Sequence, residues 1–164
     1  MALADSLDLL AAAAPEHLRG ALSQLLETLA DLATPDGLWL QVTDCPGLKG
    51  NYAETSASAM IAYAALSAAC QGIWPPGGAL GARALRTIEA TRLVHDAGTG
   101  RAHLISICAV AGLGGAKQRH DGTPAYYLSE PVVSDDPKGA GPLLMAGAEV
   151  FRTSPRRQAV AGLA

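Results

Sequence analysis

Residues 57–74 (ASAMIAYAALSAACQGIW) most constrain the fold, because this run contains no charged side chain. Its length would be enough to cross a bilayer. However, the run is rich in Ala and Ser and has no basic residues close beside it, which favours a buried helix with small packing residues over a membrane span. A helix without a polar face must be covered on several sides by other elements. The sequence therefore predicts a helical domain built around this segment.

Apolar residues recur at helical spacing on both sides of this run, which predicts about five helices. We expect them at residues 1–13, 16–33, 52–73, 79–96 and 138–151. The stretch 37–42 (GLWLQV) is expected to be extended. Asp136 followed by Pro137 is a good N-cap and N1 pair for the last helix, with Asp135 as a solvated neighbour. Nearly uncharged helices alternate with more amphipathic ones, which is typical of stacked antiparallel hairpins. We predict an all-α arc of a hairpin ring that five helices cannot close.

The composition argues against several classes of protein. A net charge of −3 and a pI near 5.7 give no electrostatic footprint for nucleic acid. The cysteines Cys45, Cys70 and Cys108 have neither CxxC nor zinc spacing, so we expect reduced thiols. The first ten residues carry two aspartates and lack the basic segment of a secretory signal. We therefore expect a cytoplasmic protein that binds neither nucleic acid nor a membrane.

The long segment 101–142, rich in Gly, Pro, Asp and Tyr, is the first place to look for chemistry, because long loops in compact domains are usually functional. Its Gly-rich run 111–115 matches neither a dinucleotide fingerprint nor a P-loop. Glycines there let backbone amides approach a ligand, and an irregular packing loop is an equal alternative. The histidines have no metal-ligand spacing, and no serine-hydrolase motif is present.

Two other kinds of residue allow both a structural and a functional interpretation. Glu54 lies at the start of a helix, where it could cap the helix or contact a ligand in a polar pocket. Trp39, Tyr52, Tyr126 and Tyr127 fall in or beside loops. An aromatic ring with a polar tip suits a pocket that binds sugar, and anchoring of loop bases in the core is the ordinary alternative.

Several blocks of sequence together resemble the C-terminal half of glycoside hydrolase family 105, the unsaturated rhamnogalacturonyl hydrolases. The unsaturated glucuronyl hydrolases of family 88 are related. The blocks are DGLWLQV at 36–42, GNYAETSASAM at 50–60, ICAVAGLGG at 107–115, YYLSEPVV at 126–133 and DPKG at 136–139. The sequence departs from the family pattern at Leu40, Pro124 and Ala125.

This resemblance implies that residues 1–152 are the C-terminal portion of an (α/α)6 barrel, and we expect 153–164 to be a disordered tail. It also implies hydrolysis of Δ4,5-unsaturated uronic sugars, as in pectin degradation, by hydration of a vinyl ether without a metal or organic cofactor. The substrate would be an unsaturated uronic-acid disaccharide or oligosaccharide. The family's catalytic Asp lies in the N-terminal half and has no counterpart here, so we expect a chain that is inactive alone and has no catalytic residue.

By the same resemblance, the substrate pocket would be lined by Trp39, Gln41, Glu54, Cys108, Gly112, Gly114 and Gly115. The alternative is a non-catalytic helical module that binds a carbohydrate or a partner chain. Half a ring would leave apolar helix faces exposed, and such faces favour association, including self-association.

Overall fold

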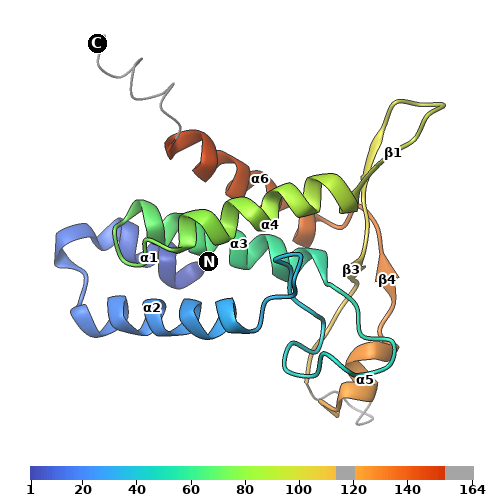
Figure 1. The fold of residues 1–164 in the computed structure, drawn as a ribbon, viewed down its shortest axis with the longest axis horizontal. Coiled ribbons are helices and arrows are strands. Elements are labelled where there is room, and N and C mark those ends of the chain that lie inside the picture. The colour runs from blue at the N-terminus through green and yellow to red at the C-terminus, as the bar shows by residue number, and fades with distance from the viewer. Residues whose placement is uncertain (114–120, 154–164) are drawn as a thin grey trace.

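The computed structural model describes residues 1–113 and 121–153, and this part of the chain is mainly helical (Figure 1). The α-helices are α1 Ala2–Leu10, α2 Glu16–Asp31, α3 Thr55–Cys70, α4 Gly77–Arg92, α5 Pro124–Ser129 and α6 Pro137–Thr153. A 3-10 turn, η1 Ala11–Ala13, follows α1. The short strands are β1 Leu93–His95, β2 Ala102–Leu104, β3 Ile107–Cys108 and β4 Val132–Val133.

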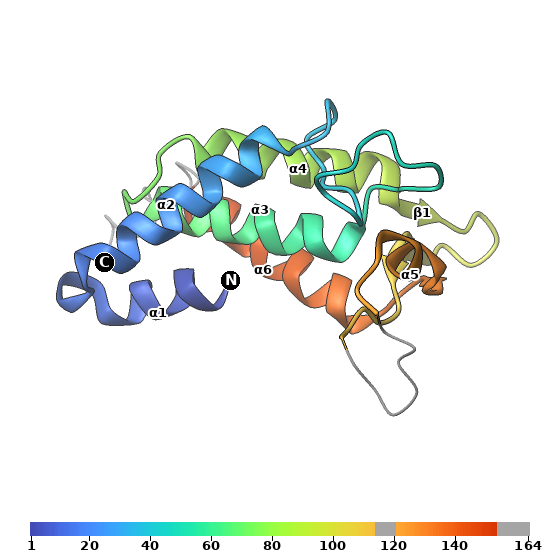
Figure 2. The same cartoon turned by 90° about the horizontal axis from the view of Figure 1, so that it is seen from below.

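Helix α3 is the centre of the molecule, as its uncharged sequence predicts. It packs along its length against both α4 and α6, while α1 and α2 meet its C-terminal half in a second core cluster. Figure 2 shows α3 in the middle of the helical layer. Most of its residues are buried, including the polar Ser56, Ser58 and Ser67. No helix in the described ranges is long and apolar enough to cross a membrane.

Small residues allow α3 and α4 to pack with their backbones close together. A Cβ atom placed on Gly81 would lie 2.7 Å from the carbonyl oxygen of Ala62, and one on Gly77 would lie even closer to the carbonyl oxygen of Ala65. On the other side of α3, the Tyr63 hydroxyl donates to Asp5 Oδ1 of α1 at 2.5 Å. Gly77 and Gly81 of α4 are therefore required for this close approach of α4 to α3.

Helix α4 ends four residues before the position that the sequence predicts. Residues 93–95 leave the helix and form an antiparallel hairpin with 102–104, in which Leu93 pairs with Leu104 and His95 with Ala102. Asp96 closes the turn, because its Oδ1 accepts hydrogen bonds at 2.8 Å from the backbone N–H groups of Gly98 and Thr99. His95 is exposed and lies on β1.

Three further expectations need correction. Residues 52–54 precede α3, whose N-cap is Glu54. The stretch 37–42 forms one isolated bridge, between Leu40 and Ala53, and no strand.

Asp135 is more than a solvated neighbour. Its Oδ1 accepts a hydrogen bond from the backbone N–H of Leu104 at 2.9 Å, and its Oδ2 lies 2.7 Å from His103 Nδ1. The predicted cap at Asp136 is confirmed, since its Oδ1 accepts from the Lys138 N–H at 2.8 Å.

Candidate functional site

The loops that carry the predicted site residues gather at one end of the bundle, at the N-terminus of α3. Figure 1 shows the loop that leads into α3, strands β3 and β4 and helix α5 grouped there. Strand β3 pairs antiparallel with β4, in the register Ile107 with Val133 and Cys108 with Val132. This ladder joins two parts of the long segment 101–142 that are far apart in the sequence.

The carboxylate of Glu54 is the centre of this region and is only 2% exposed. It accepts hydrogen bonds from the backbone N–H of Ala57 at 2.5 Å, from the Ser56 hydroxyl at 2.9 Å and from the backbone N–H of Cys108 at 2.9 Å. The first of these bonds caps α3, which satisfies an N–H that has no partner within the helix. The last bond joins β3 to α3. Glu54 therefore has the capping role that the sequence allows, and its role in contacting a ligand stays a prediction.

Gln41 and Cys108, both predicted site residues, are in direct contact. The Gln41 side-chain amide donates to Cys108 Sγ at 3.3 Å, and the backbone N–H of Gln41 donates to the carbonyl of Tyr52 at 2.9 Å. Burial raises the pKa of Tyr52, and the neighbouring Cys108 thiol and Glu54 carboxylate raise it further. The phenol is therefore protonated at neutral pH. The cluster combines one carboxylate with neutral donors, which suits the orientation of a polar ligand.

Trp39 lies beneath this cluster in the main core, where its side chain is fully buried. Its indole N–H donates to the Leu29 carbonyl at 2.7 Å, and its backbone N–H donates to the Ser58 hydroxyl at 3.0 Å. This is the core-anchoring position that the sequence left open as an alternative. Contact between Trp39 and a substrate stays a prediction.

The Gly-rich run is tied to α5. The backbone N–H of Gly112 donates to the hydroxyl of Tyr126 at 3.1 Å, and the rings of Tyr126 and Tyr127 lie 5.1 Å apart between centroids. Burial raises the pKa of Tyr126. The other two predicted glycines, Gly114 and Gly115, lie outside the described residues. The structure thus brings Cys108 into contact with both Gln41 and Glu54. Gly112 lies on the segment that follows Cys108, where it contacts α5.

Two further residues hold the site together and were not predicted as part of it. The Ser56 hydroxyl contacts both oxygens of Glu54. The Lys138 ammonium at the start of α6 donates to the Ala109 carbonyl at 2.6 Å and lies 3.1 Å from Asp136 Oδ2. A polar Glu-Thr-Ser-Ala-Ser run at the start of an otherwise apolar helix was the available signal for Ser56. Lys138 is distant in sequence from the other site residues, and its signal was its place in the family block DPKG at 136–139.

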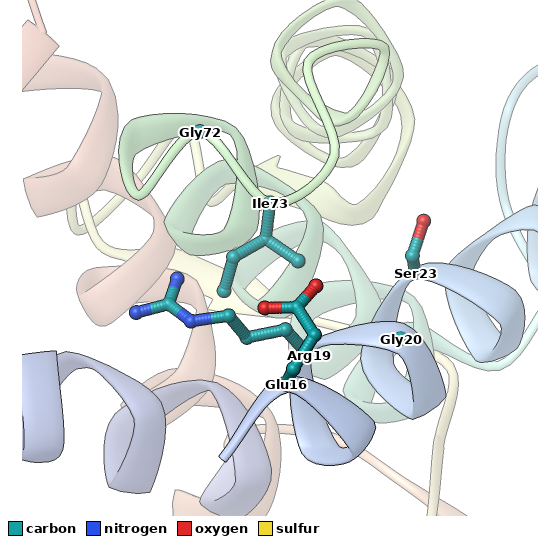
Figure 3. Close-up of a pocket in the computed structure, with 6 residues that line it drawn as sticks. All are labelled: Glu16, Arg19, Gly20, Ser23, Gly72 and Ile73. Carbon is teal, nitrogen blue, oxygen red and sulfur yellow. The ribbon is translucent and has the colours of Figure 1, made fainter. Parts of the chain in front are cut away.

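A pocket of about 540 Å³ lies at the opposite end of α3, between α2 and the loop that follows α3 (Figure 3). It is lined by Glu16, Arg19, Gly20, Ser23, Gly72 and Ile73, none of which is a predicted site residue. Arg19 donates to the carbonyl of Ala11 at 2.6 Å. Within the described ranges, no group of three or more His, Cys, Asp or Glu side chains could hold a metal ion.

A family model and two relatives match most of this chain. The family model described as Glycosyl Hydrolase Family 88 matches residues 1–154. Protein Atu3128 of Agrobacterium fabrum and the 24.9 kDa protein in the picA locus of Rhizobium radiobacter are each 51% identical to this chain over 156 residues. The match covers 91% of this chain and 66% of each relative. The chain thus spans slightly less than two thirds of the length of these relatives.

Among solved structures, a family 105 glycoside hydrolase of C. acetobutylicum has a TM-score of 0.81 and 36% identity, covering 91% of this chain and 42% of that chain. A possible member of the GH105 family from Salmonella enterica has a TM-score of 0.72 and 25% identity, covering 92% of this chain and 36% of that one. The predicted all-α hairpin fold is confirmed as part of such a six-hairpin toroid. The resemblance drawn from the sequence blocks is also confirmed: the chain belongs to Glycosyl Hydrolase Family 88.

Proposed function

We propose that this chain forms one part of a hydrolase domain that acts on unsaturated uronic-acid oligosaccharides of the rhamnogalacturonyl or glucuronyl type. The observation that carries the proposal is the match of the family model to residues 1–154. The 36% identity to a family 105 glycoside hydrolase over 91% of the chain supports it.

The proposed reaction is hydration of the vinyl ether in the unsaturated sugar. A carboxylic acid gives its proton to C4 of the C4=C5 bond, and water adds at C5. The hemiketal that results opens, and the glycosidic bond breaks. We assign no residue of this chain as the proton donor, because the resemblance puts that Asp in the other half of the barrel. The chain alone is therefore expected to be inactive.

In this proposal the residues of this chain form and hold one wall of the pocket. Glu54 fixes strand β3 against the N-terminus of α3 through the Cys108 N–H. Gln41, held by Cys108 Sγ and by the Tyr52 carbonyl, is placed to orient a polar ligand. We also propose a cytoplasmic location, which the three free cysteines in the structure support.

A chimera tests this proposal. This chain would replace the corresponding C-terminal part of the family 105 glycoside hydrolase of C. acetobutylicum. Turnover of an unsaturated rhamnogalacturonyl disaccharide would be followed as loss of absorbance by its double bond. We expect turnover by the chimera and none by this chain alone. The unmodified hydrolase, shown to be active on the same disaccharide, serves as the control.

Two results would count against the proposal. A folded chimera that leaves every unsaturated uronide intact would contradict the assigned substrate class. Turnover by the isolated chain would contradict the expectation that the proton donor lies elsewhere. In the chimera, Gln41→Ala should raise KM more than it lowers kcat, because an orienting amide contributes to binding in both the ground state and the transition state.

A further inference from the structure

A short antiparallel ribbon leads into α3. Its centre is the bridge between Leu40 and Ala53, and beside this bridge the N–H of Gln41 donates to the carbonyl of Tyr52 at 2.9 Å. Side chains alternate between the two faces of such a ribbon, and directly paired residues share a face. Gln41 and Tyr52 are therefore neighbours on one face, and Glu54, two residues after Tyr52, lies on the same face.

The polar side chains of this face converge on Cys108. The N–H of Cys108 donates to Glu54 at 2.9 Å, and its Sγ accepts from the Gln41 amide at 3.3 Å. Burial raises the pKa of the Tyr52 phenol, and the Cys108 thiol beside it raises this pKa further. The thiol itself donates to the Val110 carbonyl at 3.5 Å. Two donors, the Gln41 amide and the Tyr52 hydroxyl, thus lie beside one sulfur acceptor.

The Tyr52 hydroxyl is the donor without an acceptor. Its oxygen is buried, and within residues 1–113 and 121–153 it has no hydrogen-bond partner. Folded proteins pair the great majority of buried polar groups, because an unpaired one lowers stability. Gln41 differs from Tyr52 in this respect, since its side chain is only half-buried and its amide is bonded to sulfur, a weak acceptor. The Gln41 amide can therefore turn outward, whereas the Tyr52 hydroxyl stays inside.

The backbone of the ribbon is fixed on both sides of this pair. The Asn51 side chain accepts from the Val42 N–H at 3.1 Å and donates to the Val42 carbonyl at 2.8 Å. On the other side of the bridge, the Glu54 N–H donates to the Trp39 carbonyl at 2.9 Å. A change of partners on this face therefore involves the side chains and leaves the backbone in place.

We propose that Tyr52 is a positioning residue that replaces Gln41 on Cys108 Sγ when the Gln41 amide turns to a ligand. In the free chain, Gln41 donates to Sγ. When its amide donates to a hydroxyl oxygen of a sugar, the Tyr52 hydroxyl donates to Sγ instead. The bond that forms offsets the bond that breaks, so Gln41 is released more easily. The sugar as ligand rests on the proposed function, whereas the exchange of the two donors does not.

Urea denaturation of this chain tests the exchange without a ligand. Tyr52→Phe removes an unpaired hydroxyl, so the urea midpoint should stay unchanged or rise. Gln41→Ala leaves Sγ free for the Tyr52 hydroxyl, and in that background Tyr52→Phe should lower the midpoint. The matched control is Tyr63→Phe, which loses its bond to Asp5 and should lower the midpoint equally in both backgrounds.

Two results of this double-mutant cycle would overturn the proposal. If Tyr52→Phe lowers the midpoint equally in both backgrounds, the hydroxyl already has a partner that does not depend on Gln41. If it lowers the midpoint in neither background, the hydroxyl does not reach Sγ when Gln41 is absent. Only an effect that changes with the residue at position 41 shows that the two donors compete for one acceptor.

The chimera described above tests the role in ligand binding. Tyr52→Phe should raise KM for the unsaturated disaccharide about fivefold, the effect of losing one ordinary hydrogen bond, with little change in kcat. In the Gln41→Ala chimera the same change should alter KM less than about twofold, because Tyr52 acts through Gln41. An active chimera whose KM is unchanged by Tyr52→Phe would overturn the positioning role. A wild-type chimera without turnover would count against the proposed function instead, and the urea cycle would still decide the exchange.

Discussion

The Glu54 carboxylate shows how one buried residue joins a helix to a distant strand. Its partners are the Ser56 hydroxyl and the N–H groups of Ala57 and Cys108, the last of which is far along the chain. Glu54→Gln removes the charge and leaves one acceptor oxygen for three donors. We expect a loss of about 1–3 kcal/mol in the free energy of unfolding, measured by urea denaturation. The exposed Glu27→Gln serves as control and should change stability by less than about 0.5 kcal/mol. Equal losses in the two variants would contradict a special role for Glu54.

Asp135 makes stability depend on pH. The hydrogen bond with His103 is the main cause that lowers the pKa of the Asp135 carboxyl, and the hydrogen bond from the Leu104 N–H lowers this pKa further. Because the pKa is lower in the folded state than in the unfolded state, the stabilisation is present above the unfolded pKa and is lost as pH falls through the folded one. Asp135→Asn should therefore lower the thermal midpoint at neutral pH, with a difference from wild type that shrinks in acid. Asn tolerates the positive φ of 60° at this position. Asp36→Asn, at an exposed position, should show no such trend.

At this same scale, sequence patterns identified residues whose role is local. The cap at Asp136 acts on the backbone two residues away and was predicted from the Asp-Pro pair. The contact of Gln41 with Cys108 spans 67 positions and the bond from Leu104 to Asp135 spans 31, so neither leaves a pattern in the adjacent sequence. The family blocks placed Gln41, Glu54 and Cys108 in one site without showing how they contact each other.

At the scale of elements, long periodic helices were predicted, whereas short elements were not. Strands β1 and β2 have three residues each, and α5 has six, which is too few for apolar periodicity to be recognised. Strand β3 depends on its pairing with β4, more than 20 residues away, and on the Glu54 bond to Cys108. Such elements form because tertiary contacts satisfy their backbone groups, and a local sequence pattern does not record those contacts.

The packing of α4 on α3 depends on Gly81. A Cβ at this position would lie 2.6 Å from Leu66 Cγ and 2.7 Å from the Ala62 carbonyl oxygen, so α4 would have to move away from α3. We expect Gly81→Ala to lose about 1–3 kcal/mol on overpacking, even though alanine gains about 1 kcal/mol in helix propensity. Gly20→Ala in α2, with no atom within 4 Å, should show only the gain. Urea denaturation of both variants would measure opposite signs, and a stabilised Gly81→Ala would contradict the close approach of the two helices.

On the scale of the whole molecule, the sequence predicted an arc of a larger ring, and the coverage of 42% of the family 105 structure agrees with that shape. An arc buries its inner contacts and leaves helices at its edges partly uncovered, as Leu144 and Met145 on α6 show. The approach of α4 to α6 was not predictable from either sequence pattern, because these two helices become neighbours through their shared packing on α3. The stability of such a chain should depend on what covers its edges.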